Sequence, residues 1–301
     1  MPTYMDGGTP VQLRTAAVAL LAITLVACAD AAPGSGGTAS IPSVGAIAHP
    51  TGSDQIILRV ANEGGFVPID YTLSSMPTLS LYGDGTLITP GAQDEIYPGP
   101  ALPATQQQHL TEDGIQAVLQ AALDAGLGSD RNMTDMGSVG IADASTTVLT
   151  LDAEGGHHTV HAYALGELGE RPPEMSQEEF RARADLQSFV AKLGRLESWL
   201  PDGAIDAATP YVSTSARLFV SDYTGDPALH QEPLTWPLSQ PLSGGAGTGP
   251  GGYGCLAVAG TDWSDSLLPA AQSANQLTPW VSEGGRWAIL FRPLLPEEHG
   301  C

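Results

Sequence analysis

Residues 78–91 read TLSLYGDGTLITPG, and this short stretch sets the class of fold. Leu79 and Leu81 alternate with polar residues before a glycine-rich turn at residues 83–85, and Leu87 continues the alternation after the turn. An apolar residue at every second position places those side chains on one face of a strand, and a tight turn with glycine joins two antiparallel strands. The stretch therefore predicts a β-hairpin with one buried face.

A second hairpin and a further strand are predicted on either side of this stretch. Residues 145–151 (STTVLTL) and 159–165 flank a turn at residues 154–156 (EGG), which is the pattern of another hairpin. Residues 55–61 (QIILRVA) are rich in β-branched side chains, which favour a strand. The sheet is therefore expected to be assembled from antiparallel hairpins.

A first helix is predicted to begin after Thr111. The hydroxyl of Thr111 can accept a hydrogen bond from a free amide of the first turn, and Glu112 and Asp113 lie at the positive end of the helix dipole. One face of this helix carries apolar residues, which are Ile115, Val118, Leu119, Ala122 and Leu123. Such a stripe packs on a core, and Gly126 is a suitable end for the helix.

A second helix is predicted to begin after Ser176. Glu179 follows three residues later, so the pair has the spacing of a capping box. The apolar stripe of this helix consists of Leu186, Phe189, Val190, Leu193 and Leu196. Residues 201–203 (PDG) are expected to end it, because proline and glycine interrupt helices.

The order of these elements over residues 50–203 predicts an α+β domain, in which helices cover one face of a sheet of antiparallel hairpins. The segments LYGDGT (81–86) and TEDGIQAVLQAALDAGL (111–127), followed by a hairpin, resemble uncharacterised secreted bacterial proteins and lipoproteins with the same layout. The resemblance covers roughly half of the chain and implies no assigned activity.

Residues 204–301 are richer in proline and tryptophan, and they predict a second, smaller α+β domain. Strands are expected at residues 216–221, 253–260 and 286–292, and a helix is expected at residues 266–276. The two domains together account for the body of the protein.

The three cysteines predict one disulfide bond. If Cys28 is modified, Cys255 and Cys301 remain as a pair in an exported chain, where disulfides persist. A reactive thiol pair is the alternative, but the two residues lack CxxC spacing. We expect the bond to close the C-terminal domain.

The N-terminal residues 1–27 have the layout of an export signal. Arg14 supplies a positive flank, and residues 15–27 are uncharged and mostly aliphatic. This apolar run would span about 20 Å as a helix, which is shorter than the roughly 30 Å core of a bilayer. A cleaved signal peptide is therefore expected instead of a permanent transmembrane helix.

The signal ends in LVAC at residues 25–28, which resembles the bacterial lipobox. The resemblance implies that the thiol of Cys28 receives a diacylglyceryl group, that the chain is cut before Cys28, and that the fatty chains, palmitate among them, hold the protein on a membrane. An ordinary secretory signal with an incidental cysteine is the alternative. Residues 28–49 are rich in small residues and are expected to form a flexible tether between the anchor and the body.

The composition limits the class of partner. The net charge is −22, with 33 acidic and 11 basic residues, and Lys192 is the only lysine. Phosphate backbones would repel such a body, so nucleic-acid binding is not expected. The expected contacts are the membrane through the lipid anchor and an envelope protein or a cell-wall glycan, in an extracytoplasmic location.

Two histidines of the second hairpin are candidates for a metal site. His157 and His161 lie on the same face of a strand, with Asp152 and Glu154 near them in sequence. A metal site needs further ligands, and a solvated hairpin end is the simpler interpretation. No metal and no cofactor are therefore expected.

Clustered tryptophans mark the C-terminal part. The four indoles belong to Trp236, Trp263, Trp280 and Trp287. They can form a surface on which a sugar stacks, but the large area of each ring more often fills the core of a small domain. We expect the core role and keep the glycan-binding surface as the alternative.

No catalytic motif stands out in the sequence. Ser264 and Ser266 in TDWSDSLL lie beside aspartates, yet such residues are ordinary helix caps and no histidine is placed near them. We expect a lipid-anchored envelope protein that binds a ligand or a partner without catalysis. The alternatives are a glycan-binding module and an exported hydrolase without a readable motif.

Overall fold

The computed structural model describes residues 45–137, 140–226, 228–247 and 249–301. The predicted signal peptide at residues 1–27, the predicted lipid attachment at Cys28 and most of the predicted tether lie outside the described residues. The described residues belong to one compact unit, which contains two sheets and four α-helices. The α+β class is therefore confirmed.

Both predicted hairpins are present. Strands β2 (Leu79–Tyr82) and β3 (Thr86–Pro90) pair antiparallel, with Leu81 opposite Leu87. The turn needs glycine, because Gly85 has a φ of +92° and a Cβ atom there would collide with the carbonyl oxygen of Leu110.

Strands β6 (Thr146–Ala153) and β7 (Gly156–Tyr163) form the second hairpin. Glu154 and Gly155, with φ values of 52° and 73°, make a two-residue turn that fits the twist of the strands.

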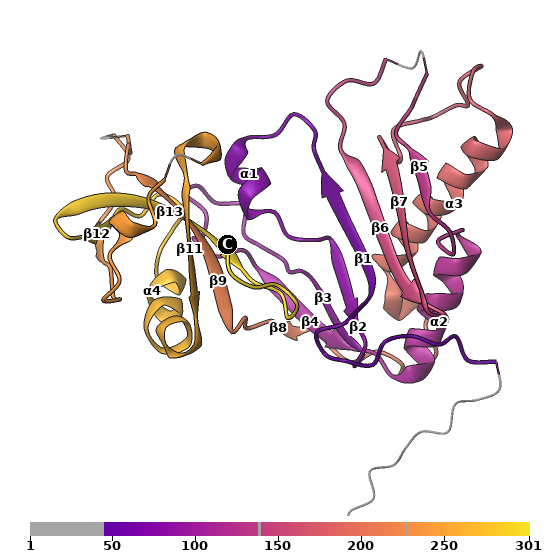
Figure 1. The fold of residues 1–301 in the computed structure, drawn as a ribbon, viewed down its shortest axis with the longest axis horizontal. Coiled ribbons are helices and arrows are strands. Elements are labelled where there is room, and N and C mark those ends of the chain that lie inside the picture. Colours follow the sequence, from indigo (N-terminus) through magenta and orange to yellow (C-terminus); the bar gives the residue numbers. More distant parts are fainter. Residues whose placement is uncertain (1–44, 138–139, 227, 248) are drawn as a thin grey trace, which may run out of the picture. The chain divides into compact units, whose positions relative to one another are not determined.

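Strand β1 (Ile56–Glu63) joins the two hairpins by pairing antiparallel with β2 on one side and with β6 on the other. Three strands that the sequence did not predict complete the sheet, namely β4 (Thr105–His109), β5 (Arg131–Met133) and β8 (Thr209–Pro210). The eight strands run in the order β5-β7-β6-β1-β2-β3-β4-β8 (Figure 1).

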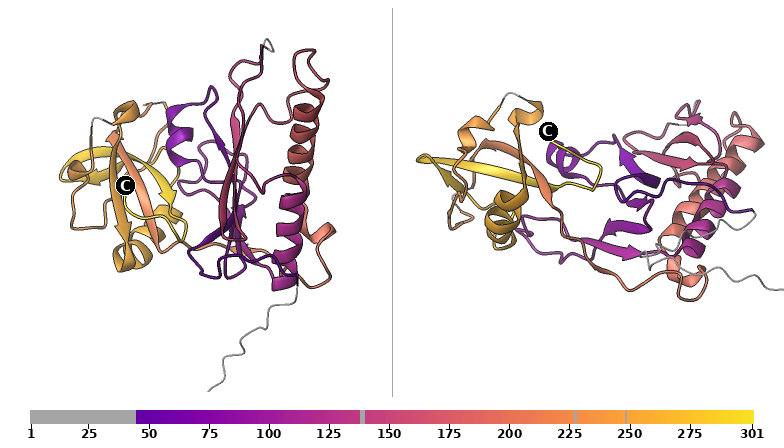
Figure 2. Two further views of the ribbon diagram at one scale, coloured as in Figure 1. Left: turned by 45° about the vertical axis from the view of Figure 1, so that its right-hand side comes forward. Right: turned by 60° about the horizontal axis from the view of Figure 1, so that its bottom comes forward.

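Two helices cover one face of this first sheet (Figure 2). Helix α2 (Glu112–Asp124) is capped by the hydroxyl of Thr111, which accepts a hydrogen bond of 3.4 Å from the amide of Gly114. Helix α3 (Gln177–Leu193) is capped by Ser176, which accepts one of 3.0 Å from the amide of Glu179. The apolar stripes of both helices pack on the leucines and valines of β1, β2, β6 and β7, as predicted.

The end of α3 differs from the prediction. The helix stops at Leu193 and not at residues 201–203, and the chain continues through a short 3₁₀ turn, η1 (Leu196–Ser198). Gly194 terminates the helix, and Leu196 still reaches the core from the 3₁₀ turn. An apolar residue at helical spacing therefore does not prove that the helix continues to it.

The chain passes from the first sheet to a second one between Pro210 and Ser215. The second sheet has the order β10-β12-β13-β9-β11. Its strands are β9 (Ser215–Asp222), β10 (Leu234–Thr235), β11 (Gly254–Ala259), β12 (Trp280–Ser282) and β13 (Gly285–Pro293). The domain boundary predicted after residue 203 stays a prediction.

The helix predicted at residues 266–276 begins and ends earlier. A π-helical stretch, η4 (Asp262–Leu267), leads into α4 (Leu268–Gln272). Pro269 lacks an amide hydrogen, so it suits the first turn of a new helical segment. The remaining short elements are α1 (Ile69–Ser74), η2 (Leu242–Gly244) and η3 (Pro250–Gly252).

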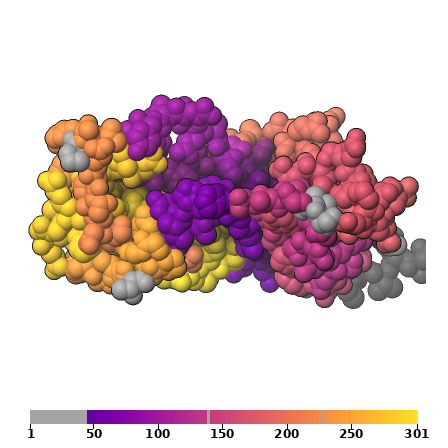
Figure 3. Space-filling model, turned by 90° about the horizontal axis from the view of Figure 1, so that it is seen from above, coloured from indigo at the N-terminus to yellow at the C-terminus, as the bar shows by residue number. Residues whose placement is uncertain are grey.

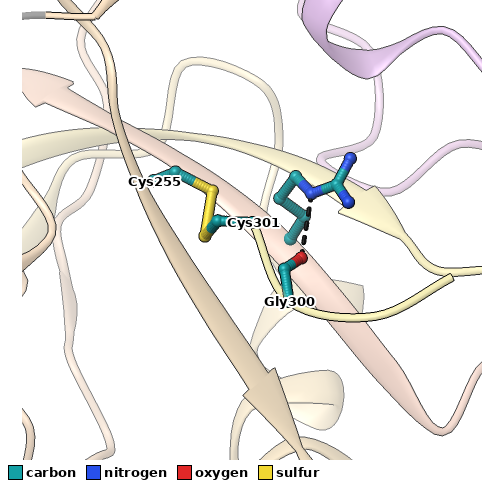
Figure 4. Close-up of a disulfide and its surroundings, with 4 residues drawn as sticks. Cys255, Gly300 and Cys301 are labelled. Carbon is teal, nitrogen blue, oxygen red and sulfur yellow. Dashed lines mark hydrogen bonds between the residues drawn. A yellow bond between two sulfur atoms is a disulfide. The ribbon is translucent and has the colours of Figure 1, made fainter.

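The predicted disulfide between Cys255 and Cys301 is present, with its Cα atoms 5.9 Å apart (Figure 4). Beside it, Arg217 Nε donates a hydrogen bond of 3.0 Å to the carbonyl oxygen of Gly300. The bond closes a separation of 46 residues and, in the chain-entropy model, stabilises the fold by about 4 kcal/mol.

The segment between β13 and the disulfide connects the two sheets. Glu297 accepts hydrogen bonds from the guanidinium of Arg59 in β1 and from the hydroxyl of Tyr82 in β2. Glu298 forms a two-pronged ion pair with Arg292, at 2.7 and 2.8 Å. Helix α1 also packs against β13, and Figure 3 shows the indigo and purple segments beside the orange and yellow ones.

The prediction that the tether extends to residue 49 is wrong for its last residues. The amide of Ile47 donates to Oε1 of Gln116 at 2.8 Å, and Nε2 of Gln116 donates to the carbonyl of Ile47 at 2.9 Å. Ile47 is buried against α2, and the carbonyl of Ala48 accepts a hydrogen bond from the amide of Glu154. Residues 47–49 are therefore fixed to the body, because a single isoleucine among small residues is enough to anchor them.

Candidate functional site

The helix layer leaves part of the first sheet open. Beyond the end of α3 the helix-side face of β2, β3 and β4 forms the floor of a groove of about 710 Å³. Leu79 and Leu87, with Val60 of the adjacent β1, supply an apolar floor of core residues that are 2–4% exposed, while Thr89 and two glutamines of β4 supply polar groups. A volume of this size lies in the range of sites for small molecules.

Strand register brings the polar groups together. In the pairing of β3 with β4, Leu87 lies opposite Gln108 and Thr89 lies opposite Gln106. Side chains of directly opposed residues share a face, so both glutamines lie on the groove side and Gln107 lies on the other. The segment TQQQH therefore gives this end of the sheet an amide-bearing surface.

The wall of the groove comes from the end of α3 and the turn that follows it. Val190 and Leu193 provide apolar surface in the last turns of the helix. Gly194 ends the helix, and the chain then places Arg195 and Glu197 at the rim. Within the described part of the chain, Arg195 has no ion pair, although acidic residues outnumber basic ones threefold.

Hydrogen bonds hold the amides of the groove in place. Nε2 of Gln106 donates to the hydroxyl of Thr89 at 3.2 Å. Nε2 of Gln108 donates to the carbonyl of Asp206 at 2.9 Å and to Oε1 of Glu197 at 3.4 Å. Among the described residues, no hydrogen bond reaches the amide oxygen of either glutamine, so both oxygens can accept bonds from a ligand. The groove thus combines an apolar floor, ordered amides and one cation.

The two histidines proposed as weak metal ligands do not come together. Nδ1 of His157 lies 2.6 Å from Oδ1 of Asp152, the residue directly opposite on β6. His161 lies four residues further along β7, which corresponds to about 13 Å on an extended strand. The residues that the structure describes contain no group of three or more metal-ligating side chains suited to an ion.

Three of the four clustered tryptophans are closed to solvent. Trp236, Trp263 and Trp280 have exposed fractions of 6%, 0% and 1%, and Trp287 is partly buried. Trp280 makes edge-to-face contacts with Trp236 and Phe291, at centroid distances of 6.0 and 5.7 Å. These rings form the core of the second sheet, so the alternative of a sugar-stacking surface made by them is not supported.

The serine-rich corner lies in the π-helical stretch η4. The hydroxyl of Ser264 donates to Oδ1 of its neighbour Asp265 at 2.6 Å, and both residues are exposed. Trp263, the residue before Ser264 in η4, donates its indole N–H to the carbonyl of Ser213. In the hydrogen bonds of the described chain, no histidine contacts Ser264, so these residues do not form a serine–histidine pair.

The perturbed ionisable groups lie between the sheets, away from the groove. Burial raises the pKa of Tyr82 to about 12, and burial with the charge of Glu298 raises the pKa of Tyr211 to about 12. Burial alone would raise the pKa of Glu298, but hydrogen bonds from Arg292 and from the amide of Leu295 outweigh it and hold that pKa below its ordinary value. These shifts reflect the contact between the sheets.

Comparisons with known proteins add no function. No family model matches the chain, and no curated protein or solved structure is similar to it. In the described residues, no helix is long and apolar enough to cross a membrane. A function for the protein must therefore be inferred from the chemistry of the groove.

Proposed function

We propose that the protein is a lipid-anchored extracytoplasmic binding protein whose ligand occupies the groove beside the end of α3. The observation that carries the binding role is the groove on the helix-side face of β2–β4, where an apolar floor meets ordered amides and an arginine that forms no ion pair within the described residues. Anchoring rests on the lipobox-like residues 25–28 and on the apolar run before them.

The lining defines the class of ligand. The aliphatic floor suits an apolar body, and the glutamine amides can hydrogen-bond to a polar group that lies across it. Arg195 at the rim adds a partner for an anionic group. The ligand is therefore an elongated amphipathic molecule with an acidic or amide-bearing head, and the acidic body disfavours nucleic acids.

A blocking substitution in the groove tests this function. Gly194 lines the groove and has a negative φ, and a Cβ atom there would meet only the carbonyl oxygen of Ala191 at 3.6 Å, so Gly194→Trp fits the backbone and adds an indole at the groove wall. The probe is N-phenyl-1-naphthylamine, a neutral dye whose fluorescence rises in apolar sites. We expect wild-type protein to bind the dye and Gly194→Trp to bind it at least about tenfold more weakly, a change of about 1.4 kcal/mol.

The matched control is Gly169→Trp, an exposed position with no heavy atom near the added Cβ and outside the groove. It adds the same indole and should leave binding unchanged. Equal loss in both variants, or no dye binding by the wild type, would argue against the groove as the site.

A further inference from the structure

Strand β11 leaves one side of its backbone without a partner. It is the last strand of the second sheet and pairs only with β9. The amide of Gly260 donates to the carbonyl of Thr214. Counting back along β11 from Gly260, every second residue therefore forms a hydrogen-bonded pair with β9. Residues 254, 256 and 258 therefore face β9, and the amides and carbonyls of Cys255, Ala257 and Ala259 face outward.

In the described part of the chain, no hydrogen bond is shown for the outward amides of Cys255, Ala257 and Ala259 or for the outward carbonyls of Cys255 and Ala257, whereas the carbonyl of Ala259 belongs to the helical turn that begins at Gly260. Ala257 and Ala259 are exposed, whereas Leu256 and Val258 are buried in the core on the opposite face. The outer side of β11 is thus an accessible row of alternating donors and acceptors with small side chains, which is what a further strand needs.

The other sheet edges are short or interrupted. Edge strands β5, β8 and β10 have three, two and two residues, and β8 contains Pro210. Strand β11 has six residues, GCLAVA, with no proline and no charge. Proline, charge and shortness are the usual features that keep an edge from pairing, and β11 has none of them.

The charge distribution favours a second copy as the occupant. The chain carries a net charge of −22, yet no charged or histidine residue stands between Glu232 and Asp262. Two copies that meet at β11 therefore bring together the uncharged part of an acidic protein. An isologous contact uses the same patch twice, so it also requires a strand that complements itself.

We propose that two copies of this chain associate through antiparallel pairing of β11 with β11. With the two-fold axis at Ala257, each Ala257 lies opposite its counterpart, and Cys255 lies opposite Ala259 of the second copy. The Ala257 pair exchanges two N–H···O bonds, and in each Cys255–Ala259 pair the amide of Ala259 donates to the carbonyl of Cys255. Leu256 lies opposite Val258 of the second copy, so no charge and no bulky polar group opposes the pairing.

The contact is small, so the dimer is weak. A single pair of strands lies at the low end of specific interfaces, and we expect a dissociation constant between about 10 µM and about 1 mM. Long-range repulsion between two acidic bodies opposes it. Raising the salt from about 10 mM to about 150 mM shortens the Debye length from about 30 Å to about 8 Å and should tighten the dimer.

Sedimentation equilibrium of the full chain, in a density-matched neutral detergent, tests the proposal with three variants at one position. Ala257→Pro removes the outward amide without touching a bond to β9. Ala257→Glu places two carboxylates opposite each other in the dimer. Within the monomer the new carboxylate lies opposite Arg217 of β9, which is a compatible neighbour. This variant therefore tests the contact even if the proline variant fails to fold. Ala257→Ser keeps the amide and is the control.

We expect wild type and Ala257→Ser to show the same salt-strengthened monomer–dimer equilibrium, and the proline and glutamate variants to weaken it at least about tenfold. A wild-type chain that stays monomeric at about 1 mM in physiological salt would overturn the proposal. Dimers of undiminished strength in Ala257→Glu would overturn it as well, because the contact would then lie elsewhere.

Discussion

The Arg292–Glu298 pair shows how single side chains hold the two sheets together. Both side chains are largely buried, with exposed fractions of 9% and 18%, and Glu298 also accepts the amide of Leu295. Arg292 Nε donates to the carbonyl of Ser75 in the loop after α1. The pair therefore fixes the segment that crosses from the second sheet to the first.

Replacing Glu298 by glutamine should destabilise the protein in a pH-dependent way. Because the pKa of Glu298 is lowered in the folded state, its contribution is present above the ordinary carboxyl pKa of about 4.3 and is lost as the pH falls through the lowered folded value. We expect Glu298→Gln to lose about 3 kcal/mol of unfolding free energy at pH 7 and progressively less below pH 4, measured by urea unfolding. The exposed Glu95→Gln is the control and should change little. A loss that does not shrink in acid would contradict the assignment.

Among single residues, the sequence predicted those whose role depends on very few partners. Cys255 and Cys301 were paired because only two cysteines remain beside Cys28. Gln106, Gln108 and Arg195 were missed, because they meet only after a strand and a helix end, far apart in the sequence, come together. The run of three glutamines in TQQQH was the one available signal.

The predicted elements are those whose signals are local. Glycine turns and side-chain caps act within a few residues, so both hairpins and both long helices were located from sequence. Strand β4 was missed because it has no apolar alternation, and its strand conformation depends on pairing with β3. The same holds for the two- and three-residue strands at the sheet edges.

The cap of α3 can be tested within one helix. Ser176 accepts the amide of Glu179, whereas Ser188 donates to the carbonyl of Ala184 in the middle of the same helix. We expect Ser176→Ala to lower the free energy of unfolding by about 1 kcal/mol, since a first-turn amide loses its partner. Ser188→Ala should cost nothing, because alanine is the better helix former. Thermal and urea unfolding of both variants distinguish them, and equal effects would show that the cap contributes no stability.

For the molecule as a whole, composition and pattern predicted the class of fold but not how the two sheets connect. The α+β class and the disulfide follow from periodicity and cysteine count. The crossing of Glu297 onto the first sheet depends on contacts with Arg59 and Tyr82, more than two hundred residues earlier in the chain. No local pattern carries that information.

Attachment to the membrane through Cys28 is the claim on which the proposed location rests. Intact-mass analysis of the native protein extracted from membranes tests it most directly. We predict a chain that begins at Cys28 and carries a diacylglyceryl group, and a Cys28→Ala variant that lacks this mass and leaves the membrane fraction while its body stays folded. A native chain with an unmodified Cys28 would contradict the account.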